Sequence, residues 1–411
     1  MLSAPLPRLA GDLLQTAATV SPVVVMMGAR QTGKSTLVQQ WENGSERPYF
    51  TLDDLATRQR AERQPEAFLA SHPSMILDEV QRVPGLLLAV KKAVDEERPR
   101  RPGRFLLTGS ANLLLMEKVS ETLAGRATYV PLWPFTVAEK RGLGRAGRWD
   151  ELFALSASRW HEWASDQRAE PVDWRTEVMR GSYPIPALEL SEGSQRALWY
   201  EGYLRTYLER DLQDLASIDN LIDFRRLMRV ACLRLGSLVN QAELGRDIQL
   251  SRPTTHRYLN LLETSFQLVR LEPYSVNRTK RLVKTPKLFW SDPGLAHHLS
   301  GAAELSGAAL ESLILLDLLA WQDSKIPRPE VLFWRTATGH EVDFVIEQAG
   351  GLLPIEVKAS SRPGWGDTRG VREFLADYGD RCPGGLVLHG GETIEWLAEN
   401  VLSLPWWLVA A

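Results

Sequence analysis

A glycine-rich segment between an apolar run and a helical run limits the folds that this chain can adopt. The segment spans residues 28–35 with the spacing Gly-x-x-x-x-Gly-Lys-Ser, and five apolar residues, 23–27, precede it. Residues 36–41 favour a helix. Such a strand, loop and helix form a phosphate-binding loop (P-loop), because the glycines let successive backbone N–H groups point at one anion. A chance turn is the less favoured alternative, since all three parts of the pattern agree.

The P-loop predicts a site for a nucleoside triphosphate with Mg²⁺. Lys34 and the positive end of the following helix attract phosphates, and the Ser35 hydroxyl is placed to ligate the metal. The expected nucleotide-binding residues are Gly28, Ala29, Arg30, Gln31, Thr32, Gly33, Lys34, Ser35 and Thr36.

Polar residues that follow two further apolar runs are expected to complete this site. Residues 75–77 lead into Asp78, expected to hold Mg²⁺ through water, and Glu79, expected to orient or deprotonate the attacking water. Two solvated loop acids are the alternative, but an upstream P-loop favours the catalytic role. After the next predicted strand, Ser110 is the candidate sensor of the γ-phosphate, and Asn112 is its alternative.

Arg126 stands after a glycine and shortly before the predicted strand 129–132. From there an arginine can reach the nucleotide of a neighbouring subunit and neutralise charge in the transition state. Composition alone favours the simpler alternative, a surface arginine in a weak salt bridge.

The order of apolar and helical runs predicts the fold class and the domains. Strands alternate with helices over residues 1–138, which indicates a parallel, doubly wound α/β sheet. A length of 411 residues allows two or three domains with cores of their own. We expect a P-loop ATPase domain (1–138), a helical linker or lid region (139–236), a winged helix-turn-helix (237–300) and a small α/β domain (301–411).

A basic segment in the third region predicts contact with DNA. Asn240 and Ser251 can cap the two helices of a helix-turn-helix, and runs 266–271 and 287–290 can pair as a wing. The segment between these runs carries clustered cations, as phosphate contact requires. A solvated basic loop, or a winged helix that contacts protein, is the alternative. The expected DNA-binding residues are Arg252, Arg278, Lys280, Arg281, Lys284 and Lys287.

The C-terminal segment places acids and a lysine on successive predicted strands. Asp343 and Glu356 can share a divalent metal, and Glu311 on the preceding helix can complete the site. Lys358 lies on the same side of its strand as Glu356, where it can help to activate a metal-bound water. The alternative is the ordinary alternation of polar and apolar residues on a half-exposed sheet.

Composition excludes some classes of protein. A net charge of −3, with 44% hydrophobic and 24% charged residues, is ordinary for a soluble globular chain, so any nucleic-acid surface must be local. Two cysteines, Cys232 and Cys382, are too few for a disulfide framework and favour a reducing cytoplasm. No uncharged apolar run reaches the roughly 20 residues of a spanning helix, so we expect no membrane partner.

Together these motifs resemble a family of bacterial and archaeal ATPases that join an AAA-type domain to a C-terminal domain of unknown function. The similarity covers nearly the whole chain, and it also includes residues 52–54, residues 207–211 and Lys287 with Asp292. The resemblance implies ATP as the nucleotide, a winged helix and a PD-(D/E)XK nuclease-like terminal domain.

The resemblance also bears on two single positions. It implies assembly into a ring, expected as a hexamer, and it raises Arg126 to the expected arginine finger. Val342 precedes Asp343 where many nuclease sites have proline, which questions DNA cleavage more than metal binding.

Two functions fit these predictions. The favoured one is a Mg²⁺-dependent ATP hydrolase that forms a ring-shaped motor, a translocase or helicase, on branched or duplex DNA. The nuclease-like domain then recognises or cuts the DNA. The alternative is an ATP-gated switch that binds DNA or protein and whose nuclease-like domain is inert. The ATPase rate of a motor should rise with DNA, whereas a switch should hydrolyse ATP slowly in either case.

Overall fold

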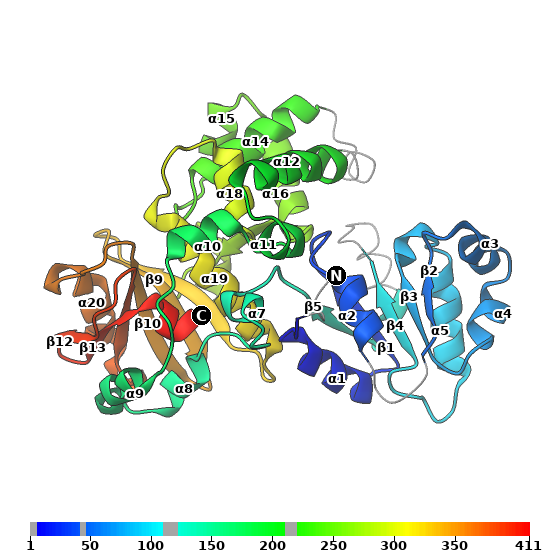
Figure 1. The fold of residues 1–411 in the computed structure, drawn as a ribbon, viewed down its shortest axis with the longest axis horizontal. Helices are drawn as coiled ribbons and strands as arrows, with labels where there is room; N and C mark the ends of the chain where they lie inside the picture. Colours follow the sequence, from blue (N-terminus) through cyan, green and yellow to red (C-terminus); the bar gives the residue numbers. More distant parts are fainter. Residues whose placement is uncertain (1–5, 42–46, 110–121, 210–219) are drawn as a thin grey trace.

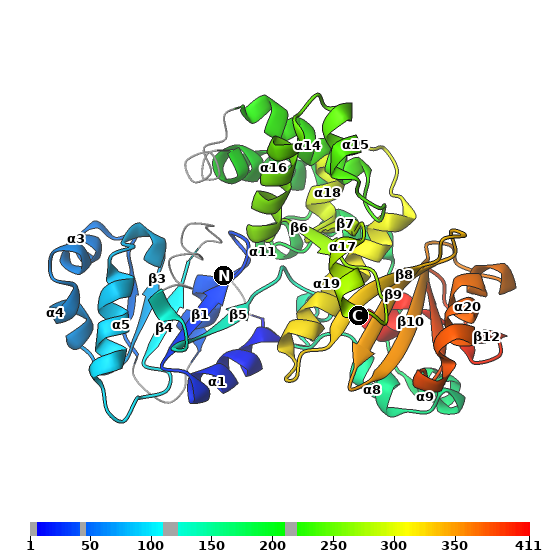
Figure 2. The same ribbon diagram turned by 180° about the vertical axis from the view of Figure 1, so that it is seen from behind.

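The computed structural model describes residues 6–41, 47–109, 122–209 and 220–411. Its elements form three groups (Figure 1). An N-terminal sheet with its helices, coloured blue to cyan, lies on one side, and a C-terminal sheet, coloured orange to red, lies on the other. A group of mostly green helices lies against both, as the reverse view also shows (Figure 2).

The N-terminal sheet is parallel throughout and has the order β2-β3-β4-β1-β5. Its strands are β1 (Val23–Met27), β2 (Tyr49–Thr51), β3 (Met75–Asp78), β4 (Phe105–Thr108) and β5 (Ala127–Pro131). Apolar clusters lie on both faces of this sheet, which explains why the central strands are apolar without alternation. The predicted parallel α/β class is confirmed, and β1, an interior strand between β4 and β5, carries the P-loop at its carboxyl end.

Helices cover both faces of the N-terminal sheet. They are α1 (Ala10–Val20), α2 (Lys34–Gln40), α3 (Leu55–Arg63), α4 (Pro65–Ala70) and α5 (Leu86–Glu96), with a 3₁₀ turn, η1 (Val80–Arg82). Residues of α1 and α2 pack with Val24 and Met26 on one face, while residues of α3, α4 and α5 pack with Val23 and Val25 on the other. Alternate residues of β1 thus supply both cores.

The expected linker region divides between two cores. Its elements are α7 (Val137–Lys140), α8 (Trp149–Ala154), η2 (Ala157–Arg159), α9 (Trp160–Asp166), α10 (Trp174–Arg180), α11 (Pro184–Leu188), α12 (Gly193–Tyr203) and a π-helix, η3 (Leu204–Glu209). Trp149 and Trp160 are fully buried in the core of the C-terminal sheet, far along the chain. Tyr183 and Tyr203 instead join the core of the helical group.

The helical group continues with the predicted helix-turn-helix and strand pair. Its elements are α14 (Leu221–Leu233), α15 (Gln241–Asp247), α16 (Arg252–Thr264), β6 (Leu268–Leu271), α17 (Arg278–Val283), β7 (Lys287–Trp290) and α18 (Pro293–Ser300). Asn240 and Ser251 cap α15 and α16 through their side-chain oxygens, as expected. Strands β6 and β7 pair antiparallel, with Leu268 opposite Trp290. The basic segment between them holds the short helix α17.

The C-terminal domain is built on a six-stranded mixed sheet with the order β12-β13-β11-β10-β9-β8. Its elements are α19 (Gly307–Ser324), β8 (Glu330–Arg335), β9 (Glu341–Gln348), β10 (Gly351–Lys358), η4 (Trp365–Thr368), α20 (Arg369–Tyr378), η5 (Gly379–Arg381), β11 (Gly385–His389), β12 (Glu395–Ala398), β13 (Val401–Pro405) and α21 (Trp406–Ala410). The successive strands predicted to carry Asp343 and Glu356 are β9 and β10.

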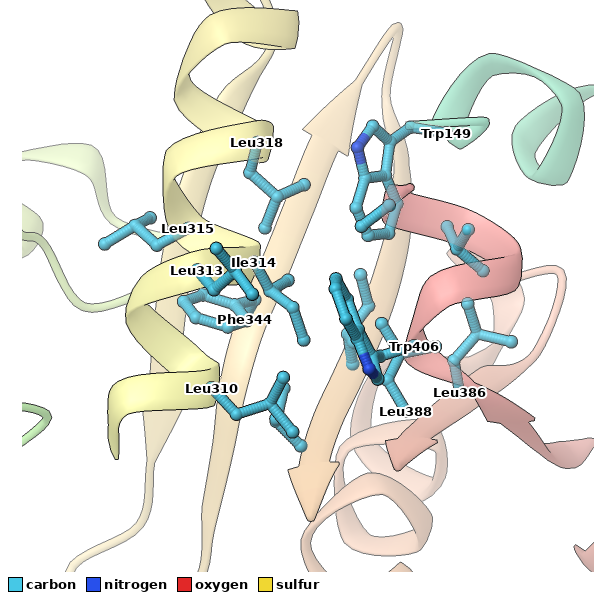
Figure 3. Close-up of a cluster of buried hydrophobic side chains, with 14 of the residues drawn as sticks. Trp149, Leu310, Leu313, Ile314, Leu315, Leu318, Phe344, Leu386, Leu388 and Trp406 are labelled. Atoms are coloured by element: carbon cyan, nitrogen blue, oxygen red, sulfur yellow. The ribbon is translucent and has the colours of Figure 1, made fainter. Parts of the chain in front are cut away.

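Helix α19 lies on one face of this sheet, and α20 lies on the other. Leu310, Ile314 and Leu318 of α19 pack with Trp149 and Trp406 in one apolar core (Figure 3). Because α19 is apolar on nearly all sides, it is buried between the sheet and the helical group. Within the described ranges, no helix combines the length and apolarity needed to span a membrane.

Candidate ATP site and two further predicted sites

The P-loop backbone has the tight curvature that a phosphate cradle requires. Gly28 has φ 151°, and a Cβ there would lie 2.2 Å from the Leu132 carbonyl oxygen, so only glycine fits. Gln31 has φ 62°, and Gly33, with φ 93°, leads into α2. The Thr32 hydroxyl donates to the Ala29 carbonyl at 2.9 Å and closes the loop on itself.

Lys34 is turned into the P-loop. Its Nζ donates to the carbonyl oxygens of Gly28 at 3.1 Å and Ala29 at 2.7 Å, and its side chain is buried. Burial lowers the pKa of Lys34 to about 8, although the nearby charges of Glu79 and Asp78 oppose this shift. In this structure the ammonium group therefore bonds to the backbone of its own loop.

Three hydroxyl groups converge on Asp78 at the carboxyl end of β3. Ser35 Oγ donates to Asp78 Oδ1 at 3.1 Å, and the hydroxyls of Thr108 and Tyr49 also bond to this carboxylate. Burial, together with the contact to Asp78, raises the pKa of Tyr49 to about 12. Hydroxyl and carboxylate oxygens in contact form the donor set that Mg²⁺ prefers, so Ser35 and Asp78 fit the predicted metal.

The sequence analysis missed both Tyr49 and Thr108. Thr108 was a recognisable candidate, because it is the polar residue that ends the apolar strand β4. Tyr49 gave no such signal, since an aromatic residue at the start of a short strand usually belongs to a core. The predicted sensor Ser110 and its alternative Asn112 lie outside the described residues.

Glu79 directly follows Asp78 in a left-handed backbone conformation, with φ 57°. Such a conformation is uncommon for a residue with a side chain and recurs at functional sites. The carboxylate accepts a hydrogen bond from the Gln81 amide, which orients it at the carboxyl edge of the sheet.

Two residues outside the motif hold the P-loop from other parts of the chain. The side chain of Arg8, which is 5% exposed, donates to the carbonyl of Thr32 at 2.9 Å, while its Nε pairs with Glu139 Oε1 at 3.1 Å. The Tyr203 hydroxyl of the helical group lies 3.5 Å from the Arg30 carbonyl oxygen. Neither contact was predictable, because both join distant segments.

Arg126 forms a two-pronged ion pair with Asp95 of α5. Its Nε and Nη2 each lie 2.7 Å from one Asp95 oxygen, and its Nη1 donates to the Ala124 carbonyl at 2.8 Å. This hydrogen-bonded pair lowers the pKa of Asp95. The arrangement is the salt bridge that composition favoured, so the role as an arginine finger stays a proposal.

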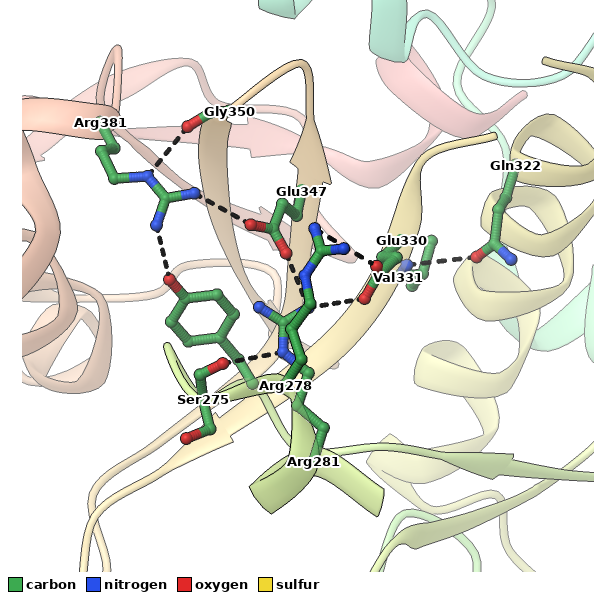
Figure 4. A network of polar contacts seen from close by, with 10 residues as sticks. Ser275, Arg278, Arg281, Gln322, Glu330, Val331, Glu347, Gly350 and Arg381 are labelled. Atoms are coloured by element: carbon green, nitrogen blue, oxygen red, sulfur yellow. Dashed lines mark hydrogen bonds and ion pairs between the residues drawn. The ribbon is translucent and has the colours of Figure 1, made fainter. Parts of the chain in front are cut away.

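The expected DNA-binding cations do not share one surface. Arg281 is 5% exposed, with Nη1 2.6 Å from Glu330 Oε2 and 2.7 Å from Glu347 Oε2 (Figure 4). Lys287 is 1% exposed. The prediction was wrong for both, because they pair with acids of the C-terminal sheet, which a local search for acids cannot find. The side chain of Lys280 lies outside the described part.

The other three cations remain available. Arg252 and Lys284 are exposed, and so is Arg278, whose Nη2 is 3.8 Å from Glu330 Oε1. A loose contact of this kind on the surface costs little to break. These three residues are what is left of the predicted basic surface.

The C-terminal strands bring Asp343 and Glu356 to one place, as expected. Ile355 pairs with Phe344, so Asp343 and Glu356 come next in register, and the backbone N–H of Val357 donates to Asp343 Oδ2 at 2.9 Å. Val357 itself is buried in the core under α19, on the opposite face. Glu356 and Lys358 share a face and pair at 2.6 Å, as strand alternation requires.

The charges at this place differ from the expected metal centre. Lys287 of β7 contacts two carboxylates here: its Nζ lies 3.1 Å from Asp343 Oδ1 and also pairs with Glu341. Burial and the Asp343 charge raise the pKa of both Glu311 and Glu356. In the part of the chain that the structure covers, no three acidic, histidine or cysteine side chains are grouped as metal ligands. The predicted metal at Asp343 and Glu356 therefore does not fit this arrangement.

Comparisons with known proteins agree with the order of the three element groups. Family models match an AAA domain at residues 20–140, a domain of unknown function (DUF8612) at 172–306 and another (DUF4143) at 306–408. An uncharacterized protein of Mycobacterium tuberculosis is 30% identical over 97% of this chain and 83% of its own length. The chain belongs to this family of AAA-domain ATPases with a C-terminal DUF4143 domain.

This AAA-domain ATPase is also similar to more distant proteins. An uncharacterized protein of Haemophilus influenzae is 20% identical over 82% of each chain. Among solved structures, a Walker-type ATPase of Pyrococcus abyssi matches with TM-score 0.39 and 16% identity, covering 73% of this chain and 99% of its own. A Thermotoga maritima RuvB variant matches with TM-score 0.29 and 16% identity, covering 64% and 88%. These scores are too low to support an argument about function.

Proposed function

We propose that this AAA-type ATPase is a Mg²⁺-dependent ATP hydrolase that assembles into a ring and acts as a motor on DNA. The observation that carries hydrolysis is the contact of Ser35 with Asp78, beside Glu79 and at the mouth of a P-loop that contains Lys34. These are the positions that metal binding, water activation and phosphate binding require.

The residues of the site have distinct tasks in the proposed reaction. Lys34 exchanges the carbonyls of Gly28 and Ala29 for phosphate oxygens, so it bonds to the triphosphate instead of to its own loop. Ser35 and Asp78 would hold Mg²⁺, which when bound neutralises charge on the phosphates. Glu79 accepts a proton from water as the water oxygen bonds to the γ-phosphorus and the bond to the bridging oxygen breaks.

In the proposed ring, expected as a hexamer, a neighbouring subunit supplies a further positive charge for the transition state. Arg126 lies at 22% side-chain exposure, and its partner Asp95 is itself partly open to solvent. A neighbouring nucleotide would have to draw Arg126 out of its two-pronged pair with Asp95, and the negative charge of a triphosphate exceeds that of one carboxylate. The arginine finger would then act between subunits.

DNA contact is proposed for the exposed cations Arg252, Arg278 and Lys284, on or next to the helices α16 and α17. Branched and duplex DNA are the proposed substrates. We assign recognition rather than cleavage to the C-terminal domain, since Lys287 already pairs with Asp343.

A second candidate, an ATP-gated switch that binds DNA or protein, is favoured by one specific contact. Ala29 of the P-loop is buried in the apolar core of the helical group together with Tyr183 and Tyr203. A change in the P-loop on nucleotide binding would therefore reach the helix-turn-helix without any need for translocation.

ATPase rates measured with single-stranded, duplex and four-way-junction DNA separate the two functions. A motor predicts a rate that rises several-fold with its preferred DNA. The triple variant R252A/R278A/K284A should keep the basal rate and lose the stimulation, and Lys34→Ala should abolish both. A basal rate that no DNA changes would refute the motor and leave the switch.

A further inference from the structure

Two cations, Arg281 between β6 and β7 and Lys287 at the start of β7, are buried against one strand of the C-terminal sheet. Arg281 of α17 pairs with Glu347 near the end of β9, and Lys287 of β7 pairs with Glu341 and Asp343 near its start. Both side chains are almost fully buried, at 6% and 1% exposure. The segment from α17 to the start of β7 is therefore held near both ends of β9.

The Arg281 end is an extended network. Arg281 also donates to the Ser275 carbonyl at 2.8 Å, and Glu347 takes a second cation, Arg381 Nη2, at 2.9 Å (Figure 4). Arg381 donates in turn to the Tyr274 hydroxyl at 3.0 Å. Each buried charge here has an opposite charge and further hydrogen bonds, which is the condition under which a buried ion pair holds its place.

Lys287, by contrast, contacts one of the predicted metal ligands, Asp343. Asp343 Oδ1 faces Lys287 Nζ at 3.1 Å, and Asp343 Oδ2 accepts the Val357 N–H at 2.9 Å, so both of its oxygens have donors. Glu356 Oε1 faces Lys358 Nζ at 2.6 Å. Glu356 Oε2 is left buried without a hydrogen-bond partner. A divalent cation would have to displace an ammonium group and then lie close to it.

We propose that the Lys287 ammonium group is the resident cation of this carboxylate cluster and stands where a nuclease-like fold would bind a divalent metal. The cluster is then a joint between the helical group and the C-terminal domain, and not a metal centre. Lys287 and Arg281 together make the segment an internal clasp, so the two parts move as one body. This inference does not depend on ATP hydrolysis, which takes place in the N-terminal domain.

Binding of Mn²⁺ to the nucleotide-free full-length protein tests the inference. The proposal predicts that Mn²⁺, titrated and followed by electron paramagnetic resonance, finds no saturable site that depends on Asp343. Lys287→Met should create such a site, and Asp343→Asn in that background should abolish it. Lys284→Met is the matched control. Lys284 lies three residues before Lys287 and is exposed, so its replacement should create no Mn²⁺ site.

Thermal unfolding gives a second readout. Lys287→Met should lower the melting temperature by about 5–10 °C, because it leaves buried carboxylates unpaired, and Mn²⁺ should restore part of this loss. Lys284→Met should melt with the parental protein. Any response of the parental melting temperature to Mn²⁺ should be the same in Asp343→Asn.

Two results would overturn the proposal. One is a parental protein that binds Mn²⁺ as tightly as Lys287→Met, with binding lost in Asp343→Asn. The other is a Lys287→Met variant that keeps parental stability and acquires no site. If Lys287→Met does not fold, the Mn²⁺ titration of the parental protein, with Asp343→Asn as its control, decides whether the proposal holds. Basal ATPase activity stays a separate measurement, so failure here and failure of the proposed motor are distinguishable.

Discussion

Replacement of Arg8 by methionine should strongly destabilise the N-terminal domain. Arg8 and Glu139 form an ion pair whose side chains are 5% and 3% exposed, and Arg8 also bonds to the carbonyls of Thr32 and Trp133. Removal of one partner of a buried pair costs about 3–5 kcal/mol, because the remaining charge stays out of water. With a urea m-value of about 1–3 kcal/mol/M, the midpoint of unfolding should fall by about 1–5 M.

The control is an arginine of the same domain in an exposed pair. Arg101 is 51% exposed and its Nε lies 3.4 Å from Glu97, so Arg101→Met should change the unfolding free energy by no more than about 1 kcal/mol. Urea unfolding followed by circular dichroism compares the two variants with the parental chain. Equal midpoints for Arg8→Met and Arg101→Met would refute the reasoning from burial.

Three further predictions concern the ATP site. Glu79→Gln should bind ATP but not turn it over, since an amide can orient water and cannot take its proton; hydrolysis at the parental rate would remove Glu79 as the base. Arg126→Ala should lower turnover by orders of magnitude and should regain activity when mixed with Lys34→Ala, if the finger acts between subunits; demonstrably mixed rings without rescue would favour the structural pair with Asp95. The pKa of Lys34 is lowered from 10.5 to about 8, so the folded chain loses this proton at a lower pH than the unfolded chain does. The free energy of unfolding should therefore rise with pH between about 8 and 10.5. Lys34→Met should remove that rise in urea titrations at pH 8 and pH 10.

The sequence by itself determined the parts of the protein that depend on short segments. The P-loop was recognisable because Gly28, Gly33 and Lys34 must stand at a set spacing for one backbone turn to hold phosphate. The parallel sheet followed from apolar runs that alternate with helices. The strand alternation that places Glu356 and Lys358 together is likewise local, since successive side chains of any strand point to opposite faces.

Only the tertiary structure decided which distant groups meet. Tyr49 and Thr108 reach Asp78 because β2, β3 and β4 are neighbours in the sheet. Trp149 belongs to the C-terminal core although it stands in the expected linker. Lys287 looked like part of a basic DNA surface, and it is buried against Asp343 instead. The sequence gives the sign of each charge, whereas its ion-pair partner depends on how segments far apart in the chain pack together.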